Sequence, residues 1–343
     1  MNLSPGKLER MKRLARPGGV IAALAMDQRG SLEKMLAQAK GCDRKDITPQ
    51  MMAEFKAAVT KHLSPHASAI LLDPEFGLGA AAARGSRTGL LLAYEKSGYD
   101  NERPGRLPDL LDNVSVKRIA EDFQADAVKV LLHYTPFEEA RLDGIPINEV
   151  KHAIVERVGA ECETYQIPFF LEFVGYDPAG GDEKGFDYAR IKPEVVTRSM
   201  AEFSQPQYKV DVLKVEIPVN LQFVEGSGVY QGRKAYSRQE ALEHFRRSAA
   251  AATKPFIYLS AGVSNRQFVE SLAMAAEAGA DFSGVLCGRA TWQDGVPRYA
   301  AGGLPALEEW LASGGVNGIN AVNAALGPAR PWYAKLGLEP PVA

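Results

Sequence analysis

The strongest constraint on the fold is a repeated alternation of short apolar runs with segments that carry helical signals. Runs rich in Val, Ile, Leu and Ala recur along the chain, at residues 20–26, 68–72, 89–94, 126–132, 167–174, 211–219, 255–259 and 282–286. Such runs are typical of strands that are buried on both faces of a parallel sheet. Alternating β and α units favour a parallel sheet, and eight of them favour closure into a barrel. The sequence therefore predicts an α/β fold, a single (β/α)8 TIM barrel with helical extensions at its N- and C-termini.

Helix start signals lie in the intervals between these runs. Thr48 and Pro49 supply an N-cap and a first-turn proline, and Ser237 with Glu240 forms a capping box. We expect helices at about residues 3–15, 31–39, 48–63, 116–123, 147–165 and 192 onward, after 237 and 264, and at 305–312 and 317–326. Only a short Ala- and Gly-rich link separates the second and third runs, and it is the weakest point of the barrel pattern.

No linker or shift in composition divides the chain, so we expect one domain over residues 1–343. The barrel core would cover about residues 18–295, and C-terminal helices with a tail would cover 296–343. The Pro-rich end from Pro328 to Ala343 is expected to be a surface tail.

Composition excludes several classes of protein. The chain has 40 Lys and Arg residues against 42 Asp and Glu residues, so no nucleic-acid partner is expected. Cys42, Cys162 and Cys287 are widely spaced and suit a reducing compartment. The charged N-terminal segment lacks an apolar signal core, and no apolar run is long enough to cross a membrane. We expect a cytoplasmic homo-oligomer that acts on a small molecule.

The run at 211–219 carries a lysine where a charge is costly. Side chains alternate along a strand, so Lys214 and Glu216 should share one face, and Leu213 and Val215 the other. Burial disfavours the ammonium form of lysine, and the neutral amine is a nucleophile that forms Schiff bases with carbonyl compounds. The alternative is a structural ion pair with Glu216 or another interior carboxylate. This strand alone favours the ion pair, and the rest of the chain favours the nucleophile.

Polar residues stand at the carboxyl ends of most predicted strands. In a (β/α)8 barrel this end holds the active site. Each residue alone can be explained by a structural ion pair, but together they would form one constellation. The residues are Asp27, Gln28, Arg29, Asp73, Glu75, Lys129, Glu172, Lys214, Glu216, Ser260 and Arg289.

The last two strand ends are suited to phosphate. Ser260 and Gly262 lead into a capped helix start after the seventh strand, and Gly288 and Arg289 follow the eighth. Small residues let backbone N–H groups approach an anion, a helix start adds positive potential, and arginine binds phosphate through a fork. The loops after strands seven and eight are also the usual phosphate site of such barrels. We therefore expect phosphate binding here, rather than glycines that serve turn geometry alone.

The histidines give no metal signature. His62 and His66 are separated by Pro65, and only His133 follows a predicted strand end. His152 and His244 add no clustered ligand pattern. We therefore expect neither a bound metal nor another cofactor.

Taken together, the strand-end motifs resemble those of the tagatose 1,6-bisphosphate aldolase family, from about Gly18 to Trp292. The motifs are MDQRG at 26–30, LDPEFG at 72–77, AYEKSGYD at 93–100, KVEIPVN at 214–220, YLSAGV at 258–263 and GVLCGRATW at 284–292. The resemblance implies a class I, Schiff-base lyase on a TIM barrel, in lactose and galactose catabolism. Such an enzyme splits a ketose bisphosphate into dihydroxyacetone phosphate and glyceraldehyde 3-phosphate.

The resemblance also implies roles for single residues. Lys214 would form the Schiff base, and Glu172 would be the base that removes the C4 hydroxyl proton. Lys129 would favour the uncharged form of Lys214 by like-charge repulsion, and Asp27 would orient the lysine or relay protons. One phosphate would bind to Ser260, Gly262, Gly288 and Arg289, and the other end of the substrate to Gln28 and Arg29.

Two departures from the family pattern bear on the substrate. His133 stands where a tyrosine is more usual, and an insert at 178–184 is expected to lie over the mouth. One alternative is therefore a related Schiff-base aldolase for a sulfonated ketose 1-phosphate, sulfofructose 1-phosphate. A second is a non-catalytic barrel that senses sugar phosphates, but a sensor needs no nucleophile such as Lys214.

Overall fold

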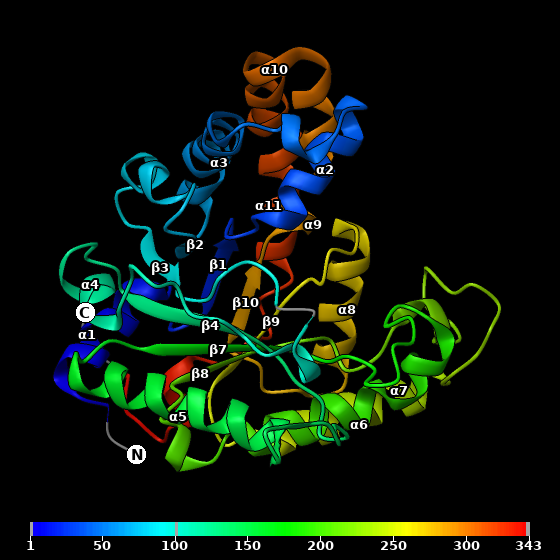
Figure 1. Ribbon diagram of the computed structural model, residues 1–343. Helices are drawn as coiled ribbons and strands as arrows, with labels where there is room; N and C mark the ends of the chain where they lie inside the picture. Colours follow the sequence, from blue (N-terminus) through cyan, green and yellow to red (C-terminus); the bar gives the residue numbers. More distant parts are fainter. Residues whose placement is uncertain (1–2, 100–101, 341–343) are drawn as a thin grey trace.

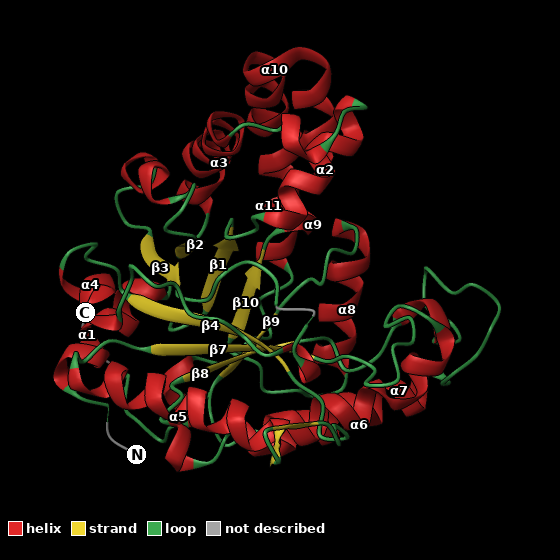
Figure 2. Cartoon of the chain, in the orientation of Figure 1, coloured by secondary structure: helices red, strands yellow, loops and turns green. Residues whose placement is uncertain are grey.

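The structure, a computed structural model, describes residues 3–99 and 102–340, and its core is a closed barrel of eight parallel strands surrounded by helices (Figures 1 and 2). Asp100 of the motif at 93–100 and residues 341–343 of the predicted tail lie outside the described residues. In spatial order the strands are β1 Ile21–Ala25, β2 Ala69–Leu72, β3 Gly89–Ala93, β4 Ala127–His133, β7 Phe169–Val174, β8 Val212–Val215, β9 Phe256–Tyr258 and β10 Gly284–Cys287, which pairs with β1 again. The predicted (β/α)8 barrel is confirmed, and every barrel strand overlaps its predicted apolar run. A short hairpin outside the barrel, β5 Arg141–Leu142 and β6 Ile145–Pro146, was not predicted.

Both faces of each barrel strand are buried, which explains why the runs are apolar throughout. Ala23, Leu71 and Leu91 pack in the barrel interior, whereas Leu24 and Ile70 pack outward against the helices. Fully buried side chains of this kind contribute about 1.5–3 kcal/mol each by leaving water.

The period of two along a strand also positions the charged residues. On three adjacent strands, the inward face passes from an apolar residue to a charged one two positions further on. Ala127 is followed by Lys129 on β4, Phe170 by Glu172 on β7, and Val212 by Lys214 on β8. The pairing register places Glu172 directly beside Lys214. The apolar layer thus forms a floor beneath one charged layer.

Helices cover the outside of the barrel, and their boundaries largely follow the start signals. The Ser237–Glu240 capping box is present, and Thr48 caps its helix. Between β2 and β3 the chain forms only short 3-10 turns at Leu78–Ala83, in agreement with the short link. The helices are α1 Pro5–Leu14, α2 Gly30–Lys40, α3 Pro49–Leu63, α4 Val116–Glu121, α5 Ile147–Thr164, α6 Phe186–Phe203, α7 Arg238–Ala251, α8 Asn265–Glu277, α9 Arg289–Trp292, α10 Val296–Trp310, α11 Val316–Ala324 and α12 Trp332–Lys335.

The predicted starts of two helices are wrong. α10 begins at Val296 rather than at residue 305, with a non-helical Gly303 just before Pro305. α6 begins at Phe186 rather than at residue 192, and Pro193 lies inside it. A proline usually marks a first helical turn, because its missing N–H costs nothing there. Here the buried side chains of Tyr188 and Ala189 extend the apolar face of α6 by a turn before the proline.

The prediction of a surface tail is also wrong at Trp332, although the other described residues at 328–340 are at least partly exposed. Trp332 is 1% exposed and packs with Met11 and Leu14 in the cluster that closes the amino end of the barrel. The Trp332 backbone N–H donates to the Gly19 carbonyl at 2.9 Å. The open end of the barrel needs an apolar cover, and a bulky side chain from the far end of the sequence supplies it.

Candidate active site

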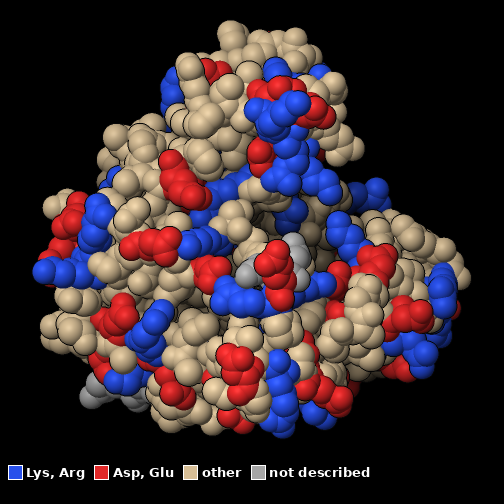
Figure 3. Space-filling model, in the orientation of Figure 1, with Lys and Arg blue, Asp and Glu red and all other residues tan. Residues whose placement is uncertain are grey.

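A cavity of about 630 Å³ opens where the carboxyl ends of the strands meet. The space-filling view is hollowed near the ends of β1 and β10, and Lys and Arg side chains gather around the hollow (Figure 3). The predicted site residues that line the cavity are Asp27, Gln28, Arg29, Lys129, Glu172, Lys214, Ser260, Gly288 and Arg289. Four residues that the sequence analysis also placed at this end are not part of the lining, namely Asp73, Glu75, Glu216 and Gly262.

Lys129 lies at the centre of a buried charge network. Its Nζ is 2.8 Å from Asp27 Oδ2, 2.7 Å from Glu95 Oε1 and 2.9 Å from Glu172 Oε2. Burial alone disfavours an ammonium group, but the three carboxylates raise the pKa of Lys129 well above its ordinary value. Lys129 is therefore a fixed cation.

Lys214 lies beside this network and shares one of its carboxylates. Its Nζ is 2.7 Å from Glu172 Oε2, and the side chain is buried. The suggested pairing with Glu216 is wrong, because Glu216 contacts Lys192 at 3.0 Å and accepts from the Gly175 N–H. Residue 216 lies beyond the last residue of β8, so the strand alternation no longer directs its side chain towards Lys214.

The carboxylates of the network are held in their charged form. Burial would raise the pKa of Asp27, but the ammonium groups of Lys129 and Lys214 hold it well below its usual range. Burial would likewise raise the pKa of Glu172, but the same two lysines lower it. Both side chains are therefore carboxylates at neutral pH, and both can accept hydrogen bonds or protons.

Glu95 is a site residue that the sequence analysis missed. It follows β3, bonds to Lys129, and accepts from the Leu131 backbone N–H at 3.0 Å through its other oxygen. Its sequence signal was the same as that of the other residues, a charge just past a strand end.

The loop that carries Asp27 is held by a buried lysine outside the cavity. Lys56 of α3 is fully buried, and its Nζ donates to the carbonyls of Met26 and Gln28, each at 2.8 Å, and to Asp73 Oδ1. These bonds fix the backbone on both sides of Asp27.

The Lys56→Met variant should lower the free energy of unfolding by about 3–5 kcal/mol, because it leaves the Asp73 carboxylate buried and unpaired. Urea denaturation measures the change. The double variant with Asp73→Leu removes the orphaned charge and should regain part of the loss. A double variant no more stable than Lys56→Met would show that the pair is not the source of the effect.

The loops after β9 and β10 meet at the Arg289 side chain. Gly262 has φ +78, and a Cβ there would lie 2.7 Å from the Arg289 guanidinium carbon, so only glycine leaves room for it. Ser260, Gly288 and Arg289 line the cavity. Burial lowers the pKa of Arg289, although Glu172 and Asp27 oppose the shift. No carboxylate within the described residues forms an ion pair with Arg289, so its guanidinium is available to an anion.

The opposite side of the cavity has a different arrangement of charge. Arg29 is buried and engaged, because it contacts Glu75 Oε2 at 3.1 Å and donates to the Glu95 carbonyl at 2.7 Å. Arg44 and Ser97 also line this side. The insert at 178–184, expected over the mouth, contributes nothing to the lining; its Glu183 pairs with Arg106 at 2.8 Å.

His133, the departure from the family pattern, does line the cavity. Its ring packs edge-on against Tyr99, with centroids 4.9 Å apart. Burial, together with the cations of Arg106 and Lys151, lowers the pKa of His133 to about 4. The imidazole is therefore neutral at pH 7 and can offer one donor and one acceptor.

The fold and the site define a class: a TIM-barrel enzyme with a buried lysine among carboxylates at the carboxyl ends of its strands. Comparisons with known proteins identify the family. Residues 21–294 match the DeoC/LacD family aldolase. Tagatose 1,6-diphosphate aldolase of Listeria monocytogenes serotype 4b is 47% identical over 339 residues, 98% of this chain and 96% of that protein. Tagatose 1,6-diphosphate aldolase 2 of Enterococcus faecalis is 48% identical over 98% of both chains. The chain belongs to the DeoC/LacD family of aldolases.

Solved structures agree with the fold. A fructose-bisphosphate aldolase from Plasmodium falciparum superposes with a TM-score of 0.63 over 94% of this chain and 96% of that one, at 14% identity. A Schiff-base-forming fructose-1,6-bisphosphate aldolase superposes with a TM-score of 0.53 over 88% and 97%, at 12% identity. At this identity the likeness concerns the barrel alone.

Two features are absent from the described residues. No group of three or more His, Cys, Asp or Glu side chains among them is arranged to hold a metal ion. No described helix is long and apolar enough to cross a membrane.

Proposed function

We propose that this aldolase uses Lys214 to form a Schiff base and cleaves a ketose 1,6-bisphosphate, D-tagatose 1,6-bisphosphate, into dihydroxyacetone phosphate and glyceraldehyde 3-phosphate. The observation that carries the proposal is the contact of the Lys214 amine with Glu172, 2.7 Å away, beside a second lysine that carboxylates keep charged. The names of the full-length relatives support the choice of tagatose bisphosphate.

The first half of the mechanism forms an electron sink. The neutral amine of Lys214 attacks the C2 carbonyl of the ketose, and loss of water gives an iminium ion. Glu172, in contact with Lys214, accepts the proton that the nitrogen loses and passes it to the C2 oxygen, which leaves as water, so Glu172 is again a carboxylate. Lys129 cannot do the same work as Lys214, because Asp27, Glu95 and Glu172 keep it in the ammonium form.

The second half breaks the carbon–carbon bond. A base removes the C4 hydroxyl proton, the C3–C4 electron pair moves into the iminium, and glyceraldehyde 3-phosphate leaves an enamine on Lys214. We assign this base to Glu172. Protonation of the enamine at C3 and hydrolysis of the iminium then release dihydroxyacetone phosphate and free Lys214. Asp27 holds Lys129 in place, 2.8 Å away, and its second oxygen is buried without a hydrogen-bond partner in the described chain.

Unsatisfied polar atoms support a polyhydroxylated substrate. Asp27 Oδ1, Gln28 Oε1 and His133 Nδ1 are buried and have no hydrogen-bond partner within the described chain. All three residues line the cavity. Buried polar atoms are normally bonded, so these three are suited to the hydroxyl groups of a sugar. We assign one phosphate to Ser260, Gly288 and Arg289, with Gly262 making room for the arginine, and the other end to the side with Gln28 and Arg29.

The Arg289→Ala variant should bind phosphorylated ketose more weakly by about 1.5–3 kcal/mol, the range for a lost hydrogen bond to a charged group. Titration with the bisphosphate and with unphosphorylated tagatose measures the change. Affinity for the unphosphorylated sugar should stay nearly constant. A surface control, Arg118→Ala, should bind like the parent protein. An equal loss for both sugars would remove Arg289 from the phosphate site.

We also expect activity to be independent of divalent metal, because the lysine supplies the electron sink that a metal ion would otherwise provide. Turnover should therefore be unchanged after dialysis against excess chelator. Activity that falls in chelator and returns with zinc would contradict the Schiff-base mechanism.

Borohydride trapping tests the proposal against its alternatives. Reduction in the presence of D-tagatose 1,6-bisphosphate should add a three-carbon phosphate to the protein, and turnover should release both triose phosphates. Efficient cleavage of sulfofructose 1-phosphate instead would favour the sulfonated substrate. Sugar-phosphate binding without trapping or turnover would favour a sensing barrel.

Three broader features stay predictions. We propose that the chain is one domain over residues 1–343, that it acts in the cytoplasm, and that it assembles as a homo-oligomer. Limited proteolysis, fractionation of cells and sedimentation of the purified protein test them in turn.

A further inference from the structure

A second cavity, of about 650 Å³, lies at the opposite end of the barrel from the candidate active site. Its walls come from the chain just before three strands, because Gly19, Ser68 and Thr88 precede β1, β2 and β3. The C-terminal segment closes another side through Trp332 and Tyr333. None of the residues assigned to the aldolase site lines it.

The charged side chains that line this amino-end cavity are all basic. Its lining includes Lys12, Arg13, Arg16 and Arg87, with His66, and no Asp or Glu. Two of these cations are neutralised, because Lys12 contacts Glu9 at 2.9 Å and Arg13 contacts Asp126 at 2.6 Å.

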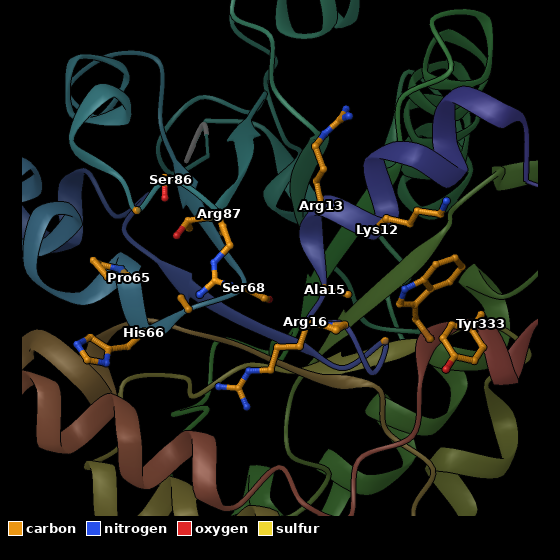
Figure 4. Close-up of a pocket in the computed structure, with 16 residues that line it drawn as sticks. Lys12, Arg13, Ala15, Arg16, Pro65, His66, Ser68, Ser86, Arg87 and Tyr333 are labelled. Atoms are coloured by element: carbon orange, nitrogen blue, oxygen red, sulfur yellow. The ribbon is translucent and has the colours of Figure 1, made fainter. Parts of the chain in front are cut away.

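Arg16 and Arg87 are the exceptions. Neither guanidinium forms an ion pair or hydrogen bond with any residue in the described chain. Figure 4 shows both side chains extending into the same space, beside His66 and Ser68. Arg16 is partly buried, and burial lowers its pKa. A partly desolvated guanidinium without a counterion is unfavourable, and a bound anion would offset that cost.

The walls around these two arginines are already fixed. Gly19 has φ +79, and a Cβ there would lie 2.5 Å from a Tyr333 ring carbon, so the glycine lets the ring pack closely. Ser68 Oγ donates to the Leu14 carbonyl and Thr88 Oγ1 to the Ser64 carbonyl, each at 2.8 Å. A ligand would therefore have little of the surrounding loops to order, which favours binding.

We propose that the amino-end cavity is a binding site for a small phosphorylated organic anion, with the phosphate between Arg16 and Arg87. Arginine forks match phosphate oxygens in geometry and charge. The ring of His66, which Figure 4 shows on the same side of the cavity as Arg87, offers surface to the organic part. The inference does not depend on the proposed reaction, because the cavity shares no residue with the site at the other end of the barrel.

The probe is inorganic pyrophosphate, titrated by calorimetry at roughly physiological salt, where weak surface attraction is screened. The titration uses the Arg289→Ala protein, in which the competing phosphate site at the mouth is weakened. Adding Arg16→Ala and Arg87→Ala should reduce the remaining affinity at least tenfold. A matched pair of exposed arginines, changed as Arg198→Ala and Arg246→Ala, should leave it within about twofold, since each already pairs with a glutamate.

Hydrogen exchange of the parent protein gives a second measurement, which does not depend on whether the variants fold. Pyrophosphate should slow exchange in peptides that cover residues 12–20 and 84–90. The proposal is overturned if pyrophosphate does not bind the Arg289→Ala protein, if the loss is equal in the control pair, or if only peptides of the aldolase site gain protection.

Discussion

Lys214→Met should abolish both turnover and borohydride trapping. The amine is the only group at the end of β8 that we assign to covalent attack, and methionine keeps the length and apolar stem of lysine at a buried position. Removal of a nucleophile costs orders of magnitude in rate, roughly 10⁴-fold or more. With dihydroxyacetone phosphate and borohydride, the parent protein should gain one three-carbon phosphate adduct on the peptide that contains Lys214.

Lys129 is the other candidate for the nucleophile. Lys129 is also buried at a strand end, but its three carboxylate partners raise its pKa, so little neutral amine is present to attack. Lys254→Met, a buried lysine that does not line the cavity, is the matched control and should trap normally. An adduct on Lys129, or undiminished trapping in Lys214→Met, would show that the nucleophile is wrongly assigned.

The barrel could be predicted because its evidence is local. A parallel strand buried on both faces leaves an unbroken apolar run, and a charged residue inside such a run needs a special explanation. Lys129, Glu172 and Lys214 were found in this way, and the inward face of their strands brings them into one layer. What the sequence could not give was the pairing within that layer.

Partners across the barrel depend on tertiary geometry. Glu95 and Lys56 looked like a loop residue and a helix residue, and only the closed barrel brings one to Lys129 and the other to Met26 and Gln28. The burial of Trp332 could not be predicted for a similar reason. Its proline-rich neighbourhood suggested exposure, whereas the open end of the barrel, more than 300 residues earlier at β1, required a cover.

Glu172→Gln should separate the covalent step from bond cleavage. Glu172 Oε2 is 2.7 Å from Lys214 Nζ and 2.9 Å from Lys129 Nζ, so one oxygen both receives protons and bridges two lysines. An amide has nearly the same shape but cannot accept a proton. Loss of a general base costs about 10²–10⁴-fold in rate, so kcat for cleavage should fall within that range.

Trapping in the Glu172→Gln protein should be slower, because Glu172 also receives the amine proton, but it should still reach completion with prolonged reduction, because Lys214 is still present to form the iminium. The matched control is Glu95→Gln, which changes a carboxylate that contacts Lys129 at 2.7 Å without forming an ion pair to Lys214. If Glu172 is the base, Glu95→Gln should slow cleavage far less than Glu172→Gln. Equal losses would mean that both act by holding Lys129, and normal cleavage by Glu172→Gln would place the base elsewhere, with Asp27 the next carboxylate to test.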